Sequence, residues 1–203
     1  MRKRIHIAFA VVLLALAGVI GWQVLRLREP VYQGKRLSFW LDAYRLYGLA
    51  GVETWQVRDE QQEADEAVRQ AGTNALPTLL RMLRAKDSAL KLTVMRLAER
   101  QHVFKINYTP AEELHYRACC AFGILRAKAR SAVPALIKIA NQNFSHDSQC
   151  YAISALASIG PPAKEAIPFL LGWATNADAA VRLYAGNALK QIEPDAAAKT
   201  GVK

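Results

Sequence analysis

A six-residue motif recurs three times in this chain of 203 residues. Its copies read ALPTLL, AVPALI and AIPFLL, and their prolines are Pro77, Pro134 and Pro168. Proline suits the first turn of an α-helix, because its φ is already helical and its missing N–H would have no partner there. The motif therefore predicts three helices that begin near these prolines. Each would turn a pair of aliphatic residues toward a core, namely Leu79 and Leu80, Leu136 and Ile137, and Leu170 and Leu171.

A second pattern, of small and aliphatic residues, recurs in the same part of the chain. Its copies are offset by 34 and 33 residues. They comprise Ala118, Ala121, Phe122 and Leu125; Ala152, Ala155, Leu156 and Ile159; and Ala185, Ala188, Leu189 and Ile192. Such a period is typical of stacked helix pairs, in which alanines let neighbouring helices approach and no single pair can bury its own apolar face. We therefore expect an all-α fold.

Together the two patterns resemble HEAT repeats of the bacterial HEAT-like type. The clearest copy, Lys164 to Ile192, reads KEAIPFLLGWATNADAAVRLYAGNALKQI. It contains the proline motif, an acidic turn and a helix with the pattern Val-Arg-x-x-Ala-x-x-Ala-Leu. The resemblance covers roughly residues 60 to 192 and implies a short α-solenoid of helix pairs, which we place at residues 38–195. It implies no function by itself, because many partners use such a stack.

Two pairs of opposite charges stand at turns of this pattern. Asp178 and Arg182 are four residues apart, and Asp87 and Lys91 repeat the arrangement. This spacing predicts an ion pair between each turn and the helix that follows it. Between them, Asp147 is followed four residues later by Tyr151, so a continuous ladder of such pairs is not expected.

The interval between the first two motif prolines is 57 residues, against 34 between the second and third. The extra sequence contains Thr109-Pro110-x-Glu112, a helix-capping signal, and predicts a loop followed by a long helix.

The segment from Ser38 to Gly51 predicts the first helix of the folded domain. Ser38 would be its N-cap and Gly51 its stop. Trp40, Tyr44 and Tyr47 fall on one face, which favours packing against a core over a stacking platform for bases or sugars.

The run from Ile5 to Leu25 carries no formal charge over 21 residues. As a helix it would span about 30 Å, enough to cross a bilayer. We therefore expect a basic tail at residues 1–4, a transmembrane or signal-anchor helix at 5–27, a linker at 28–37, and a flexible tail at 196–203. The basic tail would hold the N-terminus in the cytoplasm and place the solenoid outside it. The alternative is secretion after signal cleavage near Ala17. Ala17 and Gly21 form a small-x-x-x-small pair that would allow a homodimer through the span.

The formal net charge of +10 is unevenly distributed. Residues 1–36 hold seven cations and one acid, so much of the excess flanks the apolar run and argues against a nucleic-acid partner. Residues 81–105 and 117–138 are also basic, whereas acids gather between residues 53 and 66. These stretches are either solvated helix faces or a basic groove for an acidic partner.

No catalytic or cofactor motif is recognisable in the sequence, so we expect neither an enzyme nor a cofactor. His115 and Cys119 stand four apart, but two further metal ligands are not evident, and we interpret them as a surface histidine beside a buried thiol. Cys119, Cys120 and Cys150 make an odd count, which excludes a full disulfide framework. We interpret them as small buried residues, with one bridge from Cys150 to the preceding repeat as the alternative.

These features predict a membrane-tethered module that binds another protein on the concave face of the solenoid. The resemblance implies that the helix after each acidic turn lines that face. Exposed cations on these helices would bind carboxylates of an acidic partner, and the candidates are Arg96, Arg100, Arg117 and Lys190. One alternative is a HEAT-like lyase acting on a tetrapyrrole. Another is a solenoid that binds nucleic acid or another polyanion through its basic helix faces.

Overall fold

The computed structural model describes residues 29–45, 55–88, 93 and 108–199. This part of the chain is mostly helical, with one small antiparallel hairpin, so the all-α prediction is confirmed. The predicted span from Ile5 to Leu25 lies outside the described residues. Among the helices that are described, none combines the length and the apolar character needed to cross a bilayer.

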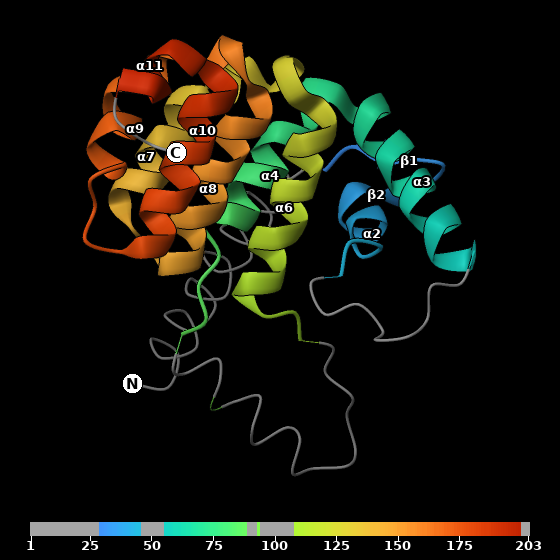
Figure 1. The fold of residues 1–203 in the computed structure, drawn as a ribbon. Coiled ribbons are helices and arrows are strands. Elements are labelled where there is room, and N and C mark those ends of the chain that lie inside the picture. The colour runs from blue at the N-terminus through green and yellow to red at the C-terminus, as the bar shows by residue number, and fades with distance from the viewer. Residues whose placement is uncertain (1–28, 46–54, 89–92, 94–107, 200–203) are drawn as a thin grey trace, which may run out of the picture.

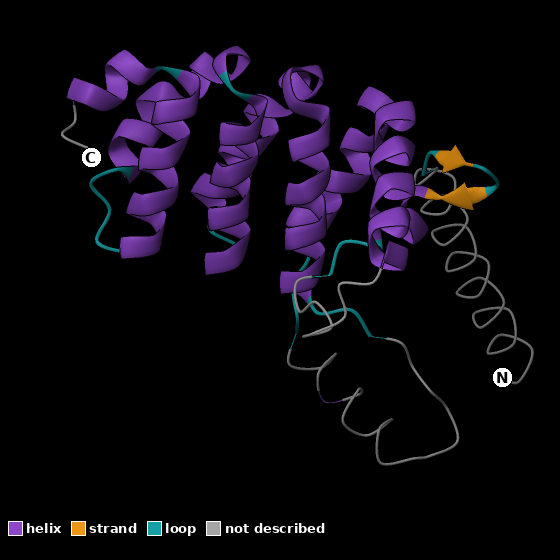
Figure 2. Ribbon diagram, turned by 45° about the vertical axis from the view of Figure 1, so that its right-hand side comes forward, coloured by secondary structure: helices purple, strands orange, loops and turns teal. Residues whose placement is uncertain are grey.

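The helices alternate between two layers along the chain (Figure 1). In one layer each helix contacts the next, in the order α3 (Trp55–Ala71), α6 (Ala111–Leu125), α8 (His146–Ile159) and α10 (Ala179–Ile192). The other layer contains α2 (Leu37–Leu41), α4 (Leu76–Leu83), α7 (Val133–Gln142) and α9 (Ile167–Trp173). Helix α2 packs on α3, α4 on α6, α7 on α8, and α9 on α10. Figure 2 shows these pairs side by side. Short 3-10 turns join successive pairs, namely η1 (Gly72–Ala75), η2 (Arg126–Ala132) and η3 (Pro161–Ala166).

The motif prolines lie in the first turns of α4, α7 and α9, as predicted. The first aliphatic residue after each proline is fully buried, at Leu79, Leu136 and Leu170. Leu171 is 36% exposed, so its predicted burial is wrong. The reason is that the short helix α9 packs on α10 with one face, and Leu171 lies beside that face.

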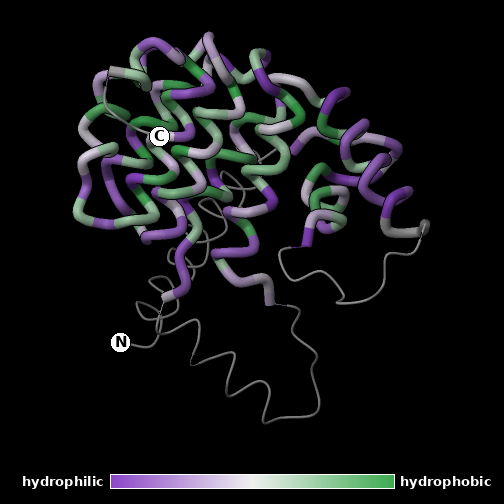
Figure 3. The backbone as a smooth tube through the Cα atoms, in the orientation of Figure 1, coloured by the Kyte–Doolittle hydropathy of each residue, from purple (hydrophilic) through white to green (hydrophobic). Residues whose placement is uncertain are grey.

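The second pattern supplies the layer of α6, α8 and α10, and all twelve of its residues are at most 3% exposed. Figure 3 shows hydrophobic segments gathered inside the helix stack and hydrophilic ones at its rim. The structure adds an earlier copy in α3, where Ala64, Ala67 and Val68 are fully buried. This copy was missed because Ala64 stands 54 residues before Ala118, against offsets of 34 and 33 between the later copies, since the sequence between α4 and α6 is longer than the later connections.

The stretch predicted as a linker at residues 28–37 contains a β-hairpin, so that prediction is wrong. Strands β1 (Val31–Tyr32) and β2 (Lys35–Arg36) pair antiparallel. Gln33 and Gly34 between them both have positive φ, 46° and 75°, as a tight hairpin turn requires. The Trp40 indole N–H donates to the carbonyl of Tyr32 at 3.1 Å, which folds the hairpin onto α2.

Helix α2 is shorter than predicted, since it ends at Leu41 and the described segment ends at residue 45. Ser38 is not its N-cap, which is Arg36; instead the Ser38 N–H donates to the Glu29 carboxylate at 3.3 Å. Trp40 and Tyr44 are buried, as predicted, whereas Tyr47 and Gly51 lie outside the described residues.

The long helix predicted after Pro110 is α6, but Thr109 does not cap it. Its first N–H, that of Ala111, donates to the Asp87 carboxylate at 2.9 Å. Ser145 caps α8, where its hydroxyl accepts from the Ser148 N–H at 3.1 Å. Short side-chain oxygens thus occupy the N-terminal ends of these helices, where N–H groups lack intrahelical partners.

The predicted ion pair between Asp178 and Arg182 is wrong. Asp178 caps α10 by accepting from the N–H groups of Ala180 and Val181 at 2.8 and 3.0 Å. Arg182 donates instead to the carbonyls of Asn176 and Ala177, both at 2.7 Å. Asp87, as described above, also caps a helix, and its predicted partner Lys91 lies outside the described residues. The carboxylates at these turns therefore cap the N-termini of helices.

The C-terminal tail, predicted to be flexible from residue 196, is helical as far as Lys199. Helix α11 (Pro194–Lys199) packs on α10. Its Ala197 is 3% exposed, so part of the predicted tail belongs to the folded stack.

Candidate functional site

A groove of about 930 Å³ lies between the hairpin and α2 on one side and α4 and α6 on the other. We call it the basic groove, because five cations and two carboxylates line it: Lys35, Arg36, Arg81, Arg84, Arg117, Glu29 and Asp42. Its apolar lining includes Phe39, Met82 and Leu114. A molecule in the groove can therefore contact both charged and apolar side chains.

Two of the cations in the basic groove are held by acids of the protein itself. Arg81 pairs with Glu29 at 2.5 Å. Arg117 pairs with Glu113 at 3.2 Å and also with Asp42 on α2. The Arg117 side chain is only 12% exposed, so its predicted exposure is wrong. The pairs of Arg81 with Glu29 and of Arg117 with Asp42 join the two walls of the groove and fix their spacing.

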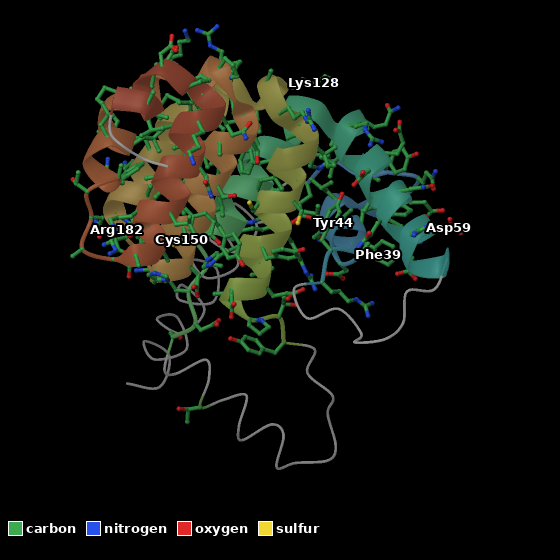
Figure 4. The ribbon with its side chains drawn as sticks, in the orientation of Figure 1. Phe39, Tyr44, Asp59, Lys128, Cys150 and Arg182 are labelled. Atoms are coloured by element: carbon green, nitrogen blue, oxygen red, sulfur yellow. The ribbon has the colours of Figure 1, made fainter. Side chains whose placement is uncertain are left out.

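The other cations of the groove, Lys35, Arg36 and Arg84, have no carboxylate partner within the described part of the chain. The Lys35 ammonium lies 4.2 Å from the centroid of the Phe39 ring, and that side chain is 51% exposed. Figure 4 shows Phe39 on the α2 segment beside α3. The groove thus presents uncompensated positive charge next to an exposed aromatic ring.

A second surface is formed by half-buried tyrosines, one from each of three neighbouring helices of one layer. They are Tyr116 on α6, Tyr151 on α8 and Tyr184 on α10, and we call this surface the tyrosine face. The rings of Tyr116 and Tyr151 meet edge to face, with centroids 6.2 Å apart. Burial raises the pKa of Tyr151 and that of Tyr184, so both hydroxyls are protonated at neutral pH.

The hydroxyls of Tyr151 and Tyr184 have no hydrogen-bond partner among the described residues. Beside them, the Cys119 thiol donates to the Ser154 hydroxyl at 3.3 Å, so α6 and α8 contact through small side chains. Tyrosine rings provide a large contact area at low entropic cost, and their hydroxyls both donate and accept. A surface of this kind suits the binding of a polypeptide.

The three cysteines are free thiols, and the alternative bridge from Cys150 is not formed. Burial raises the pKa of Cys119 and of Cys150 to about 11, and it also raises the pKa of Cys120. Because the thiolate is the reactive form, these thiols are poor nucleophiles at neutral pH. Within the described residues, no three His, Cys, Asp or Glu side chains lie close enough together to hold a metal ion.

His115 is 1% exposed, so its interpretation as a surface histidine is wrong. Its Nε2–H donates to the carbonyl of Ala85 at 3.0 Å and joins the end of α4 to α6. Desolvation lowers the pKa of His115, so the ring is neutral at pH 7. Its role is therefore explained by packing and by this one hydrogen bond.

The remaining candidate cations are divided between the described and undescribed parts of the chain. Lys190 is exposed on α10, in the same layer as the tyrosine face. Arg96 and Arg100 lie outside the described residues, and their predicted role stays a prediction. The cations that line the groove at Lys35 and Arg36 were missed, because the Gln33-Gly34 turn signal was read as part of a linker.

Comparison with protein-family models, with curated proteins and with solved structures gave no match.

Proposed function

We propose that this chain is a membrane-tethered protein-binding module, and that its partner docks on the tyrosine face. The observation that carries the proposal is the row of Tyr116, Tyr151 and Tyr184, which are partly buried on three consecutive helices of one layer. Tyrosine is enriched at protein interfaces and among the residues that dominate binding energy.

The arrangement of the helices supports a HEAT-like solenoid as the scaffold. Each helix pair contacts mainly its neighbours along the chain, as in repeat proteins whose stacked units share a continuous core. In HEAT-like stacks the layer that corresponds to α6, α8 and α10 lines the concave side. The tyrosine face would then lie on the surface that such stacks use to enclose a partner.

The chemistry of the face favours a polypeptide partner with some acidic character. The free hydroxyls of Tyr151 and Tyr184 offer hydrogen bonds to peptide groups. Lys190, exposed on α10, adds a cation for a carboxylate of the partner.

The anchor predicted at Ile5 to Leu25 would hold this module at a membrane. Glu29 already contacts the folded domain through Arg81, so few residues separate the anchor from the helix stack. A reporter fused to the C-terminus and active on only one side of the membrane tests the predicted topology. Activity outside the cytoplasm is expected, and activity inside would contradict the orientation.

The docking surface is tested by replacing single residues with a photo-crosslinking amino acid in cells that make the protein. Tyr151 is the test position, and Phe169, an aromatic residue 41% exposed on α9, is the matched control in the other layer. We expect a protein adduct from position 151 and none from position 169. Adducts of equal yield from both positions would contradict the proposal, and an adduct with nucleic acid at 151 would support the polyanion alternative.

A further inference from the structure

We propose that the basic groove is a second docking site, for an acidic polypeptide segment that carries one apolar anchor residue. The groove lies between α2, α4 and α6, whereas the tyrosine face crosses α6, α8 and α10. The inference therefore does not depend on the proposed function of the tyrosine face.

Three cations of the groove are available to bind an acidic segment. Arg81 and Arg117 are bound by Glu29 and by Asp42 with Glu113, which leaves Lys35, Arg36 and Arg84 uncompensated. Lys35 and Arg36 belong to β2, on one side of the groove. Arg84 follows α4, on the other side. A segment lying in the groove would thus meet free cations on both of its flanks, which favours carboxylates spaced along an extended chain.

The exposed ring of Phe39 offers a contact for an apolar anchor residue. Phe39 is 51% exposed, although the neighbouring Trp40 is buried in the core. The Phe39 ring lies against Trp40 in an edge-to-face contact at 5.5 Å, so its position is fixed. An apolar side chain from a bound segment would remove the Phe39 ring from water, which stabilises a complex by about 25 cal/mol for each Å² of apolar surface buried.

The existing ion pairs prepare the groove for a ligand. Glu29 binds Arg81 and also accepts the N–H of Ser38, so it connects α4 to the start of α2. Asp42 connects the end of α2 to Arg117 on α6. Both walls are therefore held before anything binds, and binding loses little entropy in ordering them.

Two other occupants fit the groove less well. A flat anionic membrane would face the carboxylates of Glu29 and Asp42 in the walls, and it could not reach an apolar lining recessed between helices. The acidic stretch of α3 in a second copy offers Asp59, Glu60 and Glu63. Residues 58–63 contain no apolar side chain, so this stretch lacks the anchor that Phe39 requires.

The test is the fluorescence anisotropy of a labelled peptide in which one phenylalanine is flanked on both sides by glutamates. The full chain is used in a mild non-ionic detergent. We expect saturable binding that weakens with salt. The double variant Arg36→Glu/Arg84→Glu should bind at least about tenfold more weakly, because the peptide would then face repulsive charges.

The matched control is Lys128→Glu/Arg130→Glu, which changes the net charge equally on exposed residues of η2. Figure 4 places Lys128 far from Phe39. This control should bind as the unmodified protein does, and so should Tyr151→Ala. Circular dichroism of each variant confirms that the helices are retained.

A double-mutant cycle tests the anchor. Phe39→Ala should weaken binding of the peptide by about tenfold, and replacing the phenylalanine of the peptide by glycine should weaken binding by a similar factor. The two changes together should be little worse than either alone, because they remove the same contact. Additive effects would overturn the role of Phe39 as the anchor site.

Three outcomes would overturn the proposal as a whole. The first is equal binding by the Arg36/Arg84 variant and the Lys128/Arg130 control. The second is binding of phosphatidylserine micelles without binding of the peptide, which would assign the groove to lipid. The third is self-association that depends on Arg36 and Arg84 without peptide binding, which would assign it to a second copy.

Discussion

The C-terminal half of the stack, from α7 to α11, and the N-terminal half, from the hairpin to α6, bury apolar residues in the same way but are joined by different contacts. The helices of the C-terminal half are joined by neutral hydrogen bonds, such as that from the Gln149 amide to the Ala140 carbonyl at 3.0 Å, and by exposed ion pairs, such as Lys164 with Glu193 at 2.9 Å. In the N-terminal half, less exposed acids such as Glu29, whose side chain is 13% exposed, form ion pairs between segments that are distant in the sequence. Contacts of this second kind hold elements together across a space, and that space is the basic groove.

The largest expected effect tests the packing of the C-terminal half. Leu170→Ala should lower the free energy of unfolding by about 2 to 5 kcal/mol, because it loses buried apolar surface and leaves a cavity. Leu171→Ala is the matched control in the same helix, and its cost should be below about 0.5 kcal/mol. Urea unfolding followed by circular dichroism measures both. Equal costs for the two variants would contradict the assignment of the α9 face.

The next effect concerns the joint between the two halves. The buried hydroxyl of Ser148 on α8 donates to the carbonyl of Leu83 on α4 at 2.6 Å. Ser148→Ala would leave that carbonyl unpaired and should cost about 1 to 3 kcal/mol. Ser158→Ala removes a hydroxyl that bonds only within its own helix, and its cost should be below about 0.5 kcal/mol. A small loss at Ser148 would mean that the halves are held together by apolar packing alone.

A smaller effect is expected for the ion pairs of the N-terminal half. Glu29→Gln keeps an acceptor for the Ser38 N–H but removes the charge that pairs with Arg81. Since the Arg81 side chain is 40% exposed, the cost should be about 0.2 to 1 kcal/mol and should disappear at high salt. Glu60→Gln, at an exposed acid of α3, should cost nothing measurable. A loss that persists at high salt would show that Glu29 acts through packing.

The smallest effect is a pH dependence at the N-terminal ends of α8 and α10. His146 forms hydrogen bonds to Asp178 and Asp147, and these raise the pKa of His146 above 6.5. Desolvation instead lowers the pKa of His115. The stability that His146 contributes is therefore fully present below its unfolded pKa and is lost as the pH rises through its folded pKa. NMR titration should show His146 titrating at a higher pH than His115. Asp178→Asn should lower the pKa of His146, and an unchanged value would contradict the role of Asp178.

Local sequence patterns predicted the helices from α4 to α10 and their core. The motif prolines begin α4, α7 and α9, and the alanine pattern fills the contacts between α6, α8 and α10, because both features depend on residues close in the chain. The copy in α3 escaped a fixed period because the sequence between α4 and α6 is longer than the later connections, which places Ala64 54 residues before Ala118.

The two surfaces were less accessible to sequence reasoning. The basic groove brings residues 29–42 against residues 78–117, and no local spacing encodes which distant carboxylate will pair with Arg117. Carboxylates at the turns were expected to pair with cations, yet Asp87 and Asp178 cap helices, since N–H groups at a helix N-terminus lack other partners. The sequence shows that Tyr116, Tyr151 and Tyr184 are present, but their alignment on one face depends on how the helices pack against one another.

The proposed function is tested most directly by the affinity of the partner recovered through the crosslink at position 151. Isothermal titration calorimetry would compare the unmodified chain with Tyr151→Ala/Tyr184→Ala and with the control Phe169→Ala. We expect the double variant to bind at least about tenfold more weakly, because aromatic residues at an interface centre dominate the binding energy. The control should bind normally. Equal affinity for the double variant and the unmodified chain would contradict a docking site on the tyrosine face.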